Sequence, residues 1–484
     1  MALLALFLIF ALPILLLYFL KPSSPKNLPP GPFSWPLLGT LGLKSNEKQA
    51  HVVLTNLAQT YGPLMLLKLG VKPVIVASTH VAAMEILKTQ DHVLSGRCPP
   101  HSVQVEDYIE ASVVWADRNE HWKMVRKICR TELFSTKMLE SQASIREERV
   151  SELIAFLRRR EGEVVKISDV IFGCMINVLG SVIFNQSVYD FEGKKDTGMK
   201  GMIRELMILA ATPNLPDFYP IFDRFDIQGL RSTTSACWKR MSESWAGIVK
   251  ERRASRDHSR NDFLDVLIQA NFTDPQIDAL FLEIFAPGSD STTTAMEWAM
   301  TELMRNPEKR LNVQNELKTV IGNRQVVKES DLPNLPYLHA CVKESLRLHP
   351  PVTFLLPHKA TETCQVMNYT IPKGTQLMVN AYAIGRDPKT WDDPLCFKPE
   401  RFLNSEVDYQ GNDFSLIPFG SGRRMCIGMP LASRVVRLII ASLIHNFDWS
   451  LPGGIKPSEL DMQEMFELVL QKHVPLSIIP NARA

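Results

Sequence analysis

The sequence predicts a large, mainly α-helical domain that follows an N-terminal apolar segment. The chain has 484 residues, of which 45% are hydrophobic and 22% are charged. This is an ordinary globular composition with enough apolar material for a large core. Several long stretches have apolar residues at helical spacing and end at prolines. No Gly/Ser-rich linker and no internal repeat interrupts residues 41–484, so we expect one folded unit there.

Residues 1–20 are expected to anchor the chain in a membrane. The run from Ala2 to Leu20 is apolar and uncharged, and about 20 such residues span a bilayer. A cleaved signal peptide is the alternative, but no basic region precedes the run and no small-residue cleavage site follows it. Lys21 and Lys26 follow the span, which predicts a cytoplasmic domain. Three glycosylation sequons should then carry no glycan: Asn185, Asn271 and Asn368.

A proline-rich hinge is expected at residues 21–40, because Leu28-Pro-Pro-Gly-Pro32 favours a stiff, extended backbone. The alternative is a generic linker. The net charge of +2 argues against nucleic acid as a partner. The eight cysteines are scattered without a CxxC pair, which argues against a zinc site or a disulfide framework and favours a reduced, cytosol-facing domain.

The most informative segment is Phe419-Gly-Ser-Gly-Arg-Arg-Met-Cys-Ile-Gly428. A cysteine thiolate such as Cys426 can ligate haem iron and favours O–O cleavage. Arg424 can pair with a haem propionate, because its guanidinium matches a carboxylate. Gly422 and Gly428 permit unusual φ/ψ angles and close backbone approach. The alternative is a Gly/Arg loop with a buried structural cysteine.

The residues after this loop predict a helix from Met429 to His445, with Pro430 in its first turn. The N-terminus of that helix would lie beside the Cys426 sulfur, where its dipole stabilises a thiolate.

A second long helix is predicted from Thr273-Asp-Pro-Gln276, with Asp274 as the N-cap, to about Leu303. Pro287 lies in its middle and costs about 3 kcal/mol in a helix interior. Two helices broken at Pro287-Gly288 are therefore the alternative. An acid and two alcohols follow: Asp290, Ser291 and Thr292.

Two further pairs of residues share helix faces. Glu344 and Arg347 lie three residues apart in a helical pattern over Leu335–His349. Trp122 and Arg126 lie four residues apart. Taken alone, the Glu-x-x-Arg spacing is more often a solvated helix face. Pro399-Glu-Arg-Phe402, which supplies Arg401, lies between it and the cysteine loop.

Along the chain the four motifs are the pair Trp122 and Arg126, the middle of the helix that starts at Thr273, the pair Glu344 and Arg347 with Arg401, and the cysteine loop. In this order they resemble the motifs of the cytochrome P450 family. The resemblance covers the whole chain. It implies a mainly α fold with small β-sheets, a central buried haem and an N-terminal single-pass membrane helix. It also implies haem b with an axial thiolate, dioxygen, and electrons from NADPH through a cytochrome P450 reductase. The catalytic domain would be cytoplasmic, at the endoplasmic reticulum membrane.

The resemblance assigns roles to the motif residues. Cys426 would ligate the iron, and Trp122, Arg126, Phe419, Gly422, Arg424 and Gly428 would contact the haem. Glu344, Arg347 and Arg401 resemble a buried charge triad. Gly288, Asp290 and Thr292 match the family's helix groove, where an acid–alcohol pair delivers protons. Pro287 and Ser291 depart from that pattern, so either Ser291 or Thr292 could be the alcohol. Lys123 and Lys127 are candidates for docking an acidic reductase; a plain solvated face is the alternative.

Finer resemblance indicates the plant microsomal branch that metabolises alkaloids, on the stretches 122–135, 362–372 and 383–388. The expected reaction is hydroxylation or oxidative phenol coupling, with oxidative rearrangement as the alternative. One carboxylate is expected to pair with the protonated amine of the substrate; solvated loop acids are the alternative. The expected substrate residues are Glu106, Asp107, Glu110, Phe281, Ile284, Val352, Phe354, Leu355, Phe466 and Glu467.

The sequence is also compatible with two other classes of haem protein. A haem-thiolate isomerase or dehydratase would need no reductase and would not require Asp290 and Ser291. A non-catalytic haem protein would not need substrate-sized variable loops.

Overall fold

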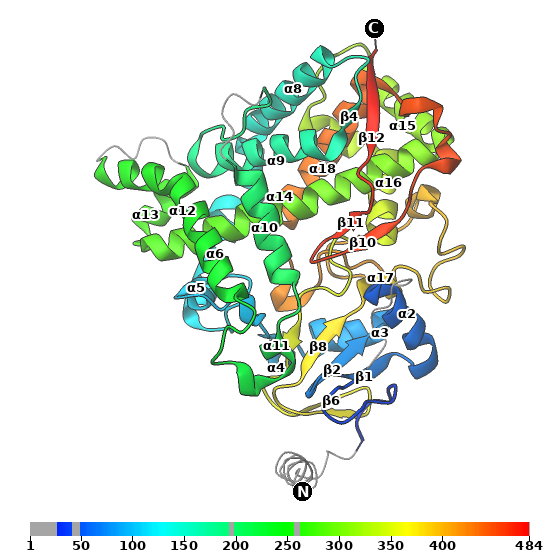
Figure 1. Cartoon of the computed structure of the whole chain (residues 1–484). Helices are drawn as coiled ribbons and strands as arrows, with labels where there is room; N and C mark the ends of the chain where they lie inside the picture. Colours follow the sequence, from blue (N-terminus) through cyan, green and yellow to red (C-terminus); the bar gives the residue numbers. More distant parts are fainter. Residues whose placement is uncertain (1–26, 41–48, 193–197, 256–261, 484) are drawn as a thin grey trace, which may run out of the picture.

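The computed structural model describes residues 27–40, 49–192, 198–255 and 262–483. The expected membrane anchor at 1–20 and the first residues of the hinge lie outside the described residues. Most of the described chain is helical and is arranged around α14 (Asp274–Arg305), while a small sheet occupies one end of the molecule (Figure 1). The mainly α architecture with small sheets predicted from the sequence is confirmed.

The helices differ widely in length. The longer ones besides α14 are α2 (Ala50–Tyr61), α6 (Glu120–Ile128), α8 (Ala143–Arg159), α9 (Ile167–Phe184), α10 (Met199–Ala211), α12 (Leu230–Ala254), α15 (Pro307–Ile321), α16 (Pro336–Leu348) and α18 (Met429–Asn446). The shorter ones are α3 (His80–Met84), α4 (Asp91–Leu94), α5 (Tyr108–Ala111), α7 (Thr136–Ser141), α11 (Leu215–Phe218), α13 (Phe263–Gln269) and α17 (Ala381–Ile384).

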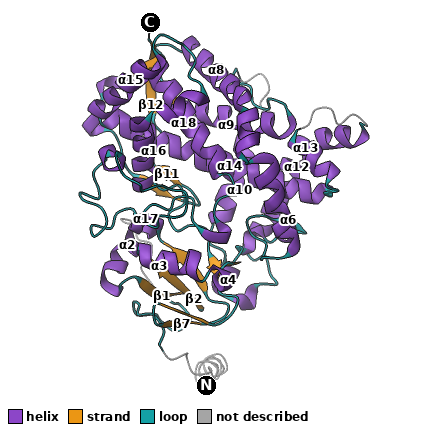
Figure 2. Ribbon diagram, turned by 180° about the vertical axis from the view of Figure 1, so that it is seen from behind, coloured by secondary structure: helices purple, strands orange, loops and turns teal. Residues whose placement is uncertain are grey.

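The central helix α14 runs unbroken for 32 residues, so the alternative of two helices split at Pro287 is wrong. Its N-cap is Thr273, one residue before the predicted Asp274. The backbone N–H of Thr273 donates to Oε1 of Gln276 at 2.9 Å, which is one half of a capping box. The helix is surrounded by α9, α10, α16 and α18 (Figure 2). Burial on nearly every side offsets the cost of an internal proline.

Helix α9 is apolar and long enough to cross a membrane, but 89% of that stretch is buried within the described fold. It packs along α14 and α8. A helix that is apolar all round is one that is covered all round. Its apolar composition is therefore explained by its place in the core.

Five short strands form the main sheet, in the order β1-β2-β8-β5-β3. Only the β2–β8 pair is parallel. The strands are β1 (Leu64–Leu69), β2 (Lys72–Ala77), β3 (Gly96–Arg97), β5 (His358–Lys359) and β8 (Gln376–Val379). Smaller sheets pair β4 (Val165–Lys166) and β9 (Phe447–Ser450) with β12 (Ser477–Ala482), β6 (Cys364–Val366) with β7 (Tyr369–Ile371), and β10 (Glu464–Phe466) with β11 (Leu470–Lys472).

The proline-rich segment is attached to this sheet over its described part. The carbonyl of Pro30 accepts from the Leu66 N–H at 2.8 Å, and Gly39 bridges to Leu69. A Cβ at Gly31 would lie 1.8 Å from the Leu66 carbonyl oxygen, so only glycine fits against β1 there. The described part of the hinge is thus attached to β1 at Pro30, Gly31 and Gly39.

Buried ion pairs tie distant elements together. Arg347 on α16 donates to Glu344 from Nε (2.7 Å) and Nη2 (2.8 Å), and Arg401 reaches the same carboxylate at 3.1 Å. Arg347 also donates to the carbonyls of Pro394 and Cys396. Because every polar group of the pair has a partner, the charges are tolerable in the interior.

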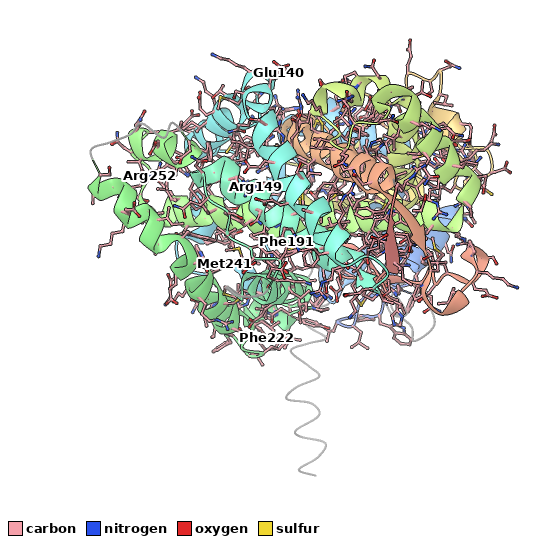
Figure 3. All side chains as sticks on the ribbon, turned by 90° about the horizontal axis from the view of Figure 1, so that it is seen from above. Glu140, Arg149, Phe191, Phe222, Met241 and Arg252 are labelled. Atoms are coloured by element: carbon pink, nitrogen blue, oxygen red, sulfur yellow. The ribbon has the colours of Figure 1, made fainter. Side chains whose placement is uncertain are left out.

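Arg252 makes a similar buried pair with Asp262 and Asp265, which joins α12 to the start of α13. Figure 3, which looks down from above, labels Arg252 at the outer end of α12 and Met241 farther along it. The first cluster ties α16 to the segment 394–401, which is distant in the chain, whereas the second ties α12 to α13, the next element along the chain.

Candidate active site

A cavity of about 300 Å³ lies at the centre of the molecule, beside the middle of α14. Its walls come from segments far apart in sequence: β3, the loop before α6, α14, the segment 351–358, the cysteine loop and the start of α18. Most of the lining is apolar. The charged lining residues are three arginines and one glutamate: Arg97, Arg126, Arg424 and Glu283.

Cys426 faces this cavity from the loop before α18. Its backbone N–H donates to the Phe419 carbonyl at 2.9 Å, which closes the loop. Protein surrounds the Cys426 thiol on all sides. The surface that remains accessible on this residue faces the cavity and not bulk water. Burial raises the pKa of the Cys426 thiol, while the N–H groups of Gly428 and Met429 and the charge of Arg126 oppose this shift. The helix N-terminus is therefore placed as predicted, but burial is the larger effect.

The two glycines of the loop behave differently. Gly422 has φ +66°, and a Cβ there would lie 1.8 Å from the Leu87 carbonyl oxygen. Both close approach and a left-handed backbone therefore require glycine. Gly428 has ordinary helical angles, φ −82° and ψ −3°, so the prediction of an unusual backbone there is wrong. A Cβ at Gly428 would meet only the Cys426 sulfur, at 4.0 Å.

Three guanidinium groups converge on one side of the cavity. Arg97 donates from Nη1 to the carbonyls of Leu356 (2.8 Å) and Pro357 (3.2 Å). Arg424 donates to the carbonyls of Ser95 (2.9 Å) and Ala116 (2.7 Å). The third guanidinium is that of Arg126. We call Arg97, Arg126 and Arg424, together with Trp122, the arginine cradle.

Trp122 packs against two members of the cradle. The Trp122 ring centroid lies 4.4 Å from the Arg424 guanidinium carbon and 5.1 Å from that of Arg126. Arg126 donates to the Met425 carbonyl at 2.9 Å, which connects α6 to the cysteine loop. The indole thus supports two cationic groups while its own N–H bonds to backbone.

The nearest acid to the arginine cradle, Asp117, raises the pKa of Arg424, but its carboxylate bonds to the Arg97 backbone N–H and to Lys359. Within the described ranges none of the cradle's three guanidiniums is ion-paired to a carboxylate. Burial lowers the pKa of Arg97 to about 9 and that of Arg424 to about 10, and repulsion between neighbouring guanidiniums adds to both shifts. Nη1 of Arg424 is buried without an acceptor. A bound group with two carboxylates would supply the missing acceptors and charge.

The acid and alcohols predicted on α14 lie in its middle. Ser291 and Thr292 both line the cavity, and each hydroxyl donates at 2.7 Å to a carbonyl one turn earlier, in Pro287 and Gly288. Asp290 lies behind the cavity wall, where Gln471 approaches it at 3.4 Å. Burial is the main reason that the pKa of Asp290 rises to about 6. Oδ2 of Asp290 is buried and has no partner.

Glu283 is a buried carboxylate that sequence reasoning missed. It lies on α14, one turn before Pro287, and is 8% exposed. The backbone N–H of Val113 (2.7 Å), the Tyr108 hydroxyl (3.0 Å) and the Ser112 hydroxyl all donate to it. Burial raises the pKa of Glu283 to about 7, although these donors favour its ionised form.

Only part of the expected substrate set lines the cavity. Ile284, Val352 and Leu355 do, and Leu355 has a strained φ of +50°. Phe281 packs on Trp245, and Phe354 packs on Phe466, away from the lining. The other expected residues outside the lining are Glu106, Asp107, Glu110, Phe466 and Glu467.

The loop acids expected near the substrate have other surroundings. Glu106, Asp107 and Glu110 are exposed, and Glu106 forms an ion pair with Lys239. Glu467 forms an ion pair with Arg204 of α10 at 3.0 Å. Among the described lining residues Glu283 is the one carboxylate, so none of the four acids from which an amine partner was expected lines the cavity.

Comparison with known proteins agrees with this arrangement. The cytochrome P450 family model matches residues 29–478. The chain is a cytochrome P450. It is 49% identical to corytuberine synthase of Coptis japonica over 98% of both chains. It is 50% identical to a probable (S)-N-methylcoclaurine 3'-hydroxylase isozyme 2 of the same plant, over 98% of this chain and 97% of the relative. It is 46% identical to berbamunine synthase of Berberis stolonifera over 97% of both chains.

This cytochrome P450 is a monooxygenase whose cofactor is haem with a thiolate ligand, supplied with dioxygen and with NADPH-derived electrons through a reductase. The residues on the cavity wall fit that cofactor. Cys426 offers a sulfur open to the cavity, and the arginine cradle offers cationic groups that form no ion pair among the described residues. A haem carries two propionates, which are the groups this cradle lacks.

Sequence reasoning missed two residues of this site, and only one of them, Glu283, had a signal in the sequence. Glu283 is a lone charge in the otherwise apolar run 279–286, a pattern that marks a buried functional or structural acid. Arg97 has no comparable signal. Its partners Val114, Leu356 and Pro357 are remote in sequence, and all of them bond to it through backbone carbonyls.

The two glycines provide a matched test of the cysteine loop. Gly422→Ala should abolish haem incorporation, because a methyl group collides with the Leu87 carbonyl and φ +66° is unfavourable for alanine. Gly428→Ala should retain most of the haem, because its backbone is helical and its Cβ meets only a sulfur at van der Waals distance. The reduced, CO-bound spectrum of each purified variant measures the fraction that binds haem through thiolate. Equal loss in both variants would contradict this assignment.

Proposed function

We propose that this cytochrome P450 oxidises a plant alkaloid, by hydroxylation or by oxidative phenol coupling. The observation that carries the proposal is the 46–50% identity, over nearly the full chain, to relatives whose names describe an N-methylcoclaurine hydroxylase and two alkaloid synthases. The walls of the cavity are compatible with such a substrate, because they are mostly apolar and include a few polar groups.

We assign the haem to the residues whose geometry suits it. Cys426 would hold the iron, and Arg97, Arg126 and Arg424 would hold the propionates. When bound, haem supplies dioxygen activation. The role of the protein is then to exclude water, to hold the substrate against the apolar wall and to move protons.

Proton delivery is assigned to α14. The Ser291 and Thr292 hydroxyls face the cavity, and Asp290 lies behind them on the side where Gln471 and Arg204 approach. A pKa of about 6 for Asp290 lets it gain and lose a proton near neutral pH. Ser291 occupies the position where the family pattern has threonine, and a serine hydroxyl is less restricted in rotamer.

The reductase is proposed to dock beside α6. Lys123 and Lys127 are exposed on this helix, and its Arg126 contacts the cysteine loop. Cationic groups at this position would attract an acidic partner to the thiolate side of the haem.

The main test of the reaction uses the full-length protein in microsomes with a cytochrome P450 reductase, NADPH and a panel of alkaloid amines that includes N-methylcoclaurine. Product masses identify the reaction. A gain of one oxygen indicates hydroxylation, and a loss of two hydrogens indicates coupling. An isomer of unchanged mass would favour oxidative rearrangement. If no amine in the panel is consumed while a non-amine substrate such as geraniol is oxidised, the alkaloid assignment is wrong.

Ser291 can be tested through coupling efficiency. Ser291→Ala should raise hydrogen peroxide released per NADPH consumed, because protons would reach dioxygen less reliably. Thr292→Ala should have the smaller effect if Ser291 is the relay and the larger one if Thr292 is. Thr293→Ala is the matched control, because Thr293 is a buried neighbour that does not line the cavity. Unchanged peroxide release in both Ser291→Ala and Thr292→Ala would remove the α14 alcohols from the mechanism.

We also propose attachment to the endoplasmic reticulum membrane with the catalytic domain in the cytoplasm. Besides the apolar N-terminal segment, two stretches with exposed large apolar side chains support this, at 33–38 and at 221–227, where they alternate with charged residues. Gly39 bridges to Leu69 and Val71 bonds to Phe218, so both stretches flank the β1–β2 turn. They lie at the end of the molecule drawn lowest in Figure 1, and Phe222 of the second stretch is labelled in Figure 3. Apolar side chains gathered at one end suit a lipid surface.

The three sequons report on this topology. Asn185, Asn271 and Asn368 are all exposed, so each would be accessible to glycosylation in the lumen. With the domain in the cytoplasm, treatment of microsomal protein with an endoglycosidase should leave its electrophoretic mobility unchanged. Removal of a glycan from any of the three would contradict the proposed orientation.

A further inference from the structure

Glu283 is a buried carboxylate, and it has no role in the proposed reaction. Its carboxylate accepts hydrogen bonds from Tyr108 of α5 and from the short stretch that follows α5. Val113 N–H donates at 2.7 Å, Val114 N–H at 3.3 Å, and the hydroxyls of Tyr108 and Ser112 donate from the same side. No cation is recorded in an ion pair with it among the described residues. Donors from residues 108–114 therefore favour the carboxylate and oppose the effect of burial on its pKa.

The opposite side of the same stretch bonds to the arginine cradle. The carbonyl of Val113 accepts from Trp122 Nε1 at 2.9 Å. The carbonyl of Val114 accepts from Arg97 Nε at 3.2 Å, and that of Ala116 accepts from Arg424 Nη2 at 2.7 Å. Residues 112–116 thus form a backbone strut, with N–H groups facing α14 and carbonyls facing the cradle.

We infer that Glu283 is a positioning residue that acts through this backbone strut, holding residues 112–116 against α14 so that Trp122, Arg97 and Arg424 are aimed at the haem propionates. The inference rests on the juxtaposition of one carboxylate, one strut and three cradle side chains. It does not depend on the identity of the substrate.

The bonding of Glu283 argues against a direct role in binding an amine. Both carboxylate oxygens already accept hydrogen bonds from the strut, so a substrate cation would have to displace buried donors. Without the carboxylate, the N–H of Val113 and the hydroxyl of Ser112 would lose their acceptor in a buried place. An unsatisfied buried donor costs about 1–3 kcal/mol, so the strut would move to find other partners.

The consequence for the cradle follows from the same geometry. A guanidinium that donates to a carbonyl follows that carbonyl when it moves. Arg97 retains the carbonyls of Leu356 and Pro357, and Arg424 retains that of Ser95. If the strut moves, Arg97 and Arg424 should therefore stay in the cavity wall, but their guanidinium groups should change orientation.

The test measures haem retention in purified, haem-loaded full-length protein by transfer to an excess of a haem-free acceptor globin. Glu283→Gln keeps the size of the side chain but presents an NH₂ to buried donors, and it should release haem roughly tenfold faster. Tyr108→Phe removes one donor and should have a smaller effect in the same direction. Glu297→Gln is the matched control, because Glu297 is also buried on α14 but accepts from Leu476. It should release haem at close to the wild-type rate.

A second measurement separates positioning from general destabilisation. Trp122→Phe removes the donor to Val113 from the opposite side of the strut. Since both changes act through the same backbone, the Glu283→Gln, Trp122→Phe double variant should lose less than the sum of the two single effects. The propionate bands in the resonance Raman spectrum should shift in Glu283→Gln and not in Glu297→Gln.

The inference is overturned if Glu283→Gln retains haem and propionate bands like the wild type, or if Glu297→Gln weakens haem binding equally. Strict additivity in the double variant would also overturn it. None of these measurements uses a substrate or reductase, so a failure of the alkaloid assignment would leave the result interpretable.

Discussion

Burial of positive charge is the constraint on which the centre of this molecule depends. Three guanidinium groups face one interior cavity, and none of them is ion-paired to a carboxylate in the part of the chain that the structure describes. An isolated charge in such a place is strongly unfavourable. The fold tolerates the three because backbone carbonyls from four separate segments accept from them and because haem brings two carboxylates. The packing of β3, the strut, the segment 351–358 and the cysteine loop around the cavity follows from that requirement.

The opposite wall of the cavity, formed by α14, is subject to a different constraint. Helix α14 must remain a continuous support across the cavity and yet offer polar groups in its middle. Pro287 removes one backbone donor, so the Glu283 carbonyl loses its helical partner. Ser291 and Thr292 bond to carbonyls one turn earlier, which tends to bend a helix. The surrounding helices α9, α10, α16 and α18 hold α14 together through this weakened turn.

Much of this site could be predicted because its parts carry local chemical signals. Phe419, Gly422, Arg424 and Cys426 form one short motif, and the structure places them around the cavity or its loop. Glu344, Arg347 and Arg401 were recognisable as a set, and they make one buried cluster. The substrate side was predicted less well. The expected acids Glu106, Asp107, Glu110 and Glu467 do not line the cavity, because a loop charge in a sequence gives no indication of which way its side chain points.

The sequence by itself determined the family, the cofactor class and the mainly helical fold, since each rests on short-range patterns: motif spacing, helical periodicity and capping. Only the tertiary structure decided which charges enter the cavity. Arg97 and Glu283 are brought there by contacts with residues 112–116 and 356–357, which are distant in the chain and bond through backbone atoms. A backbone carbonyl or N–H is the same in every residue, so no sequence pattern records it as a partner. The fold alone sets those distances.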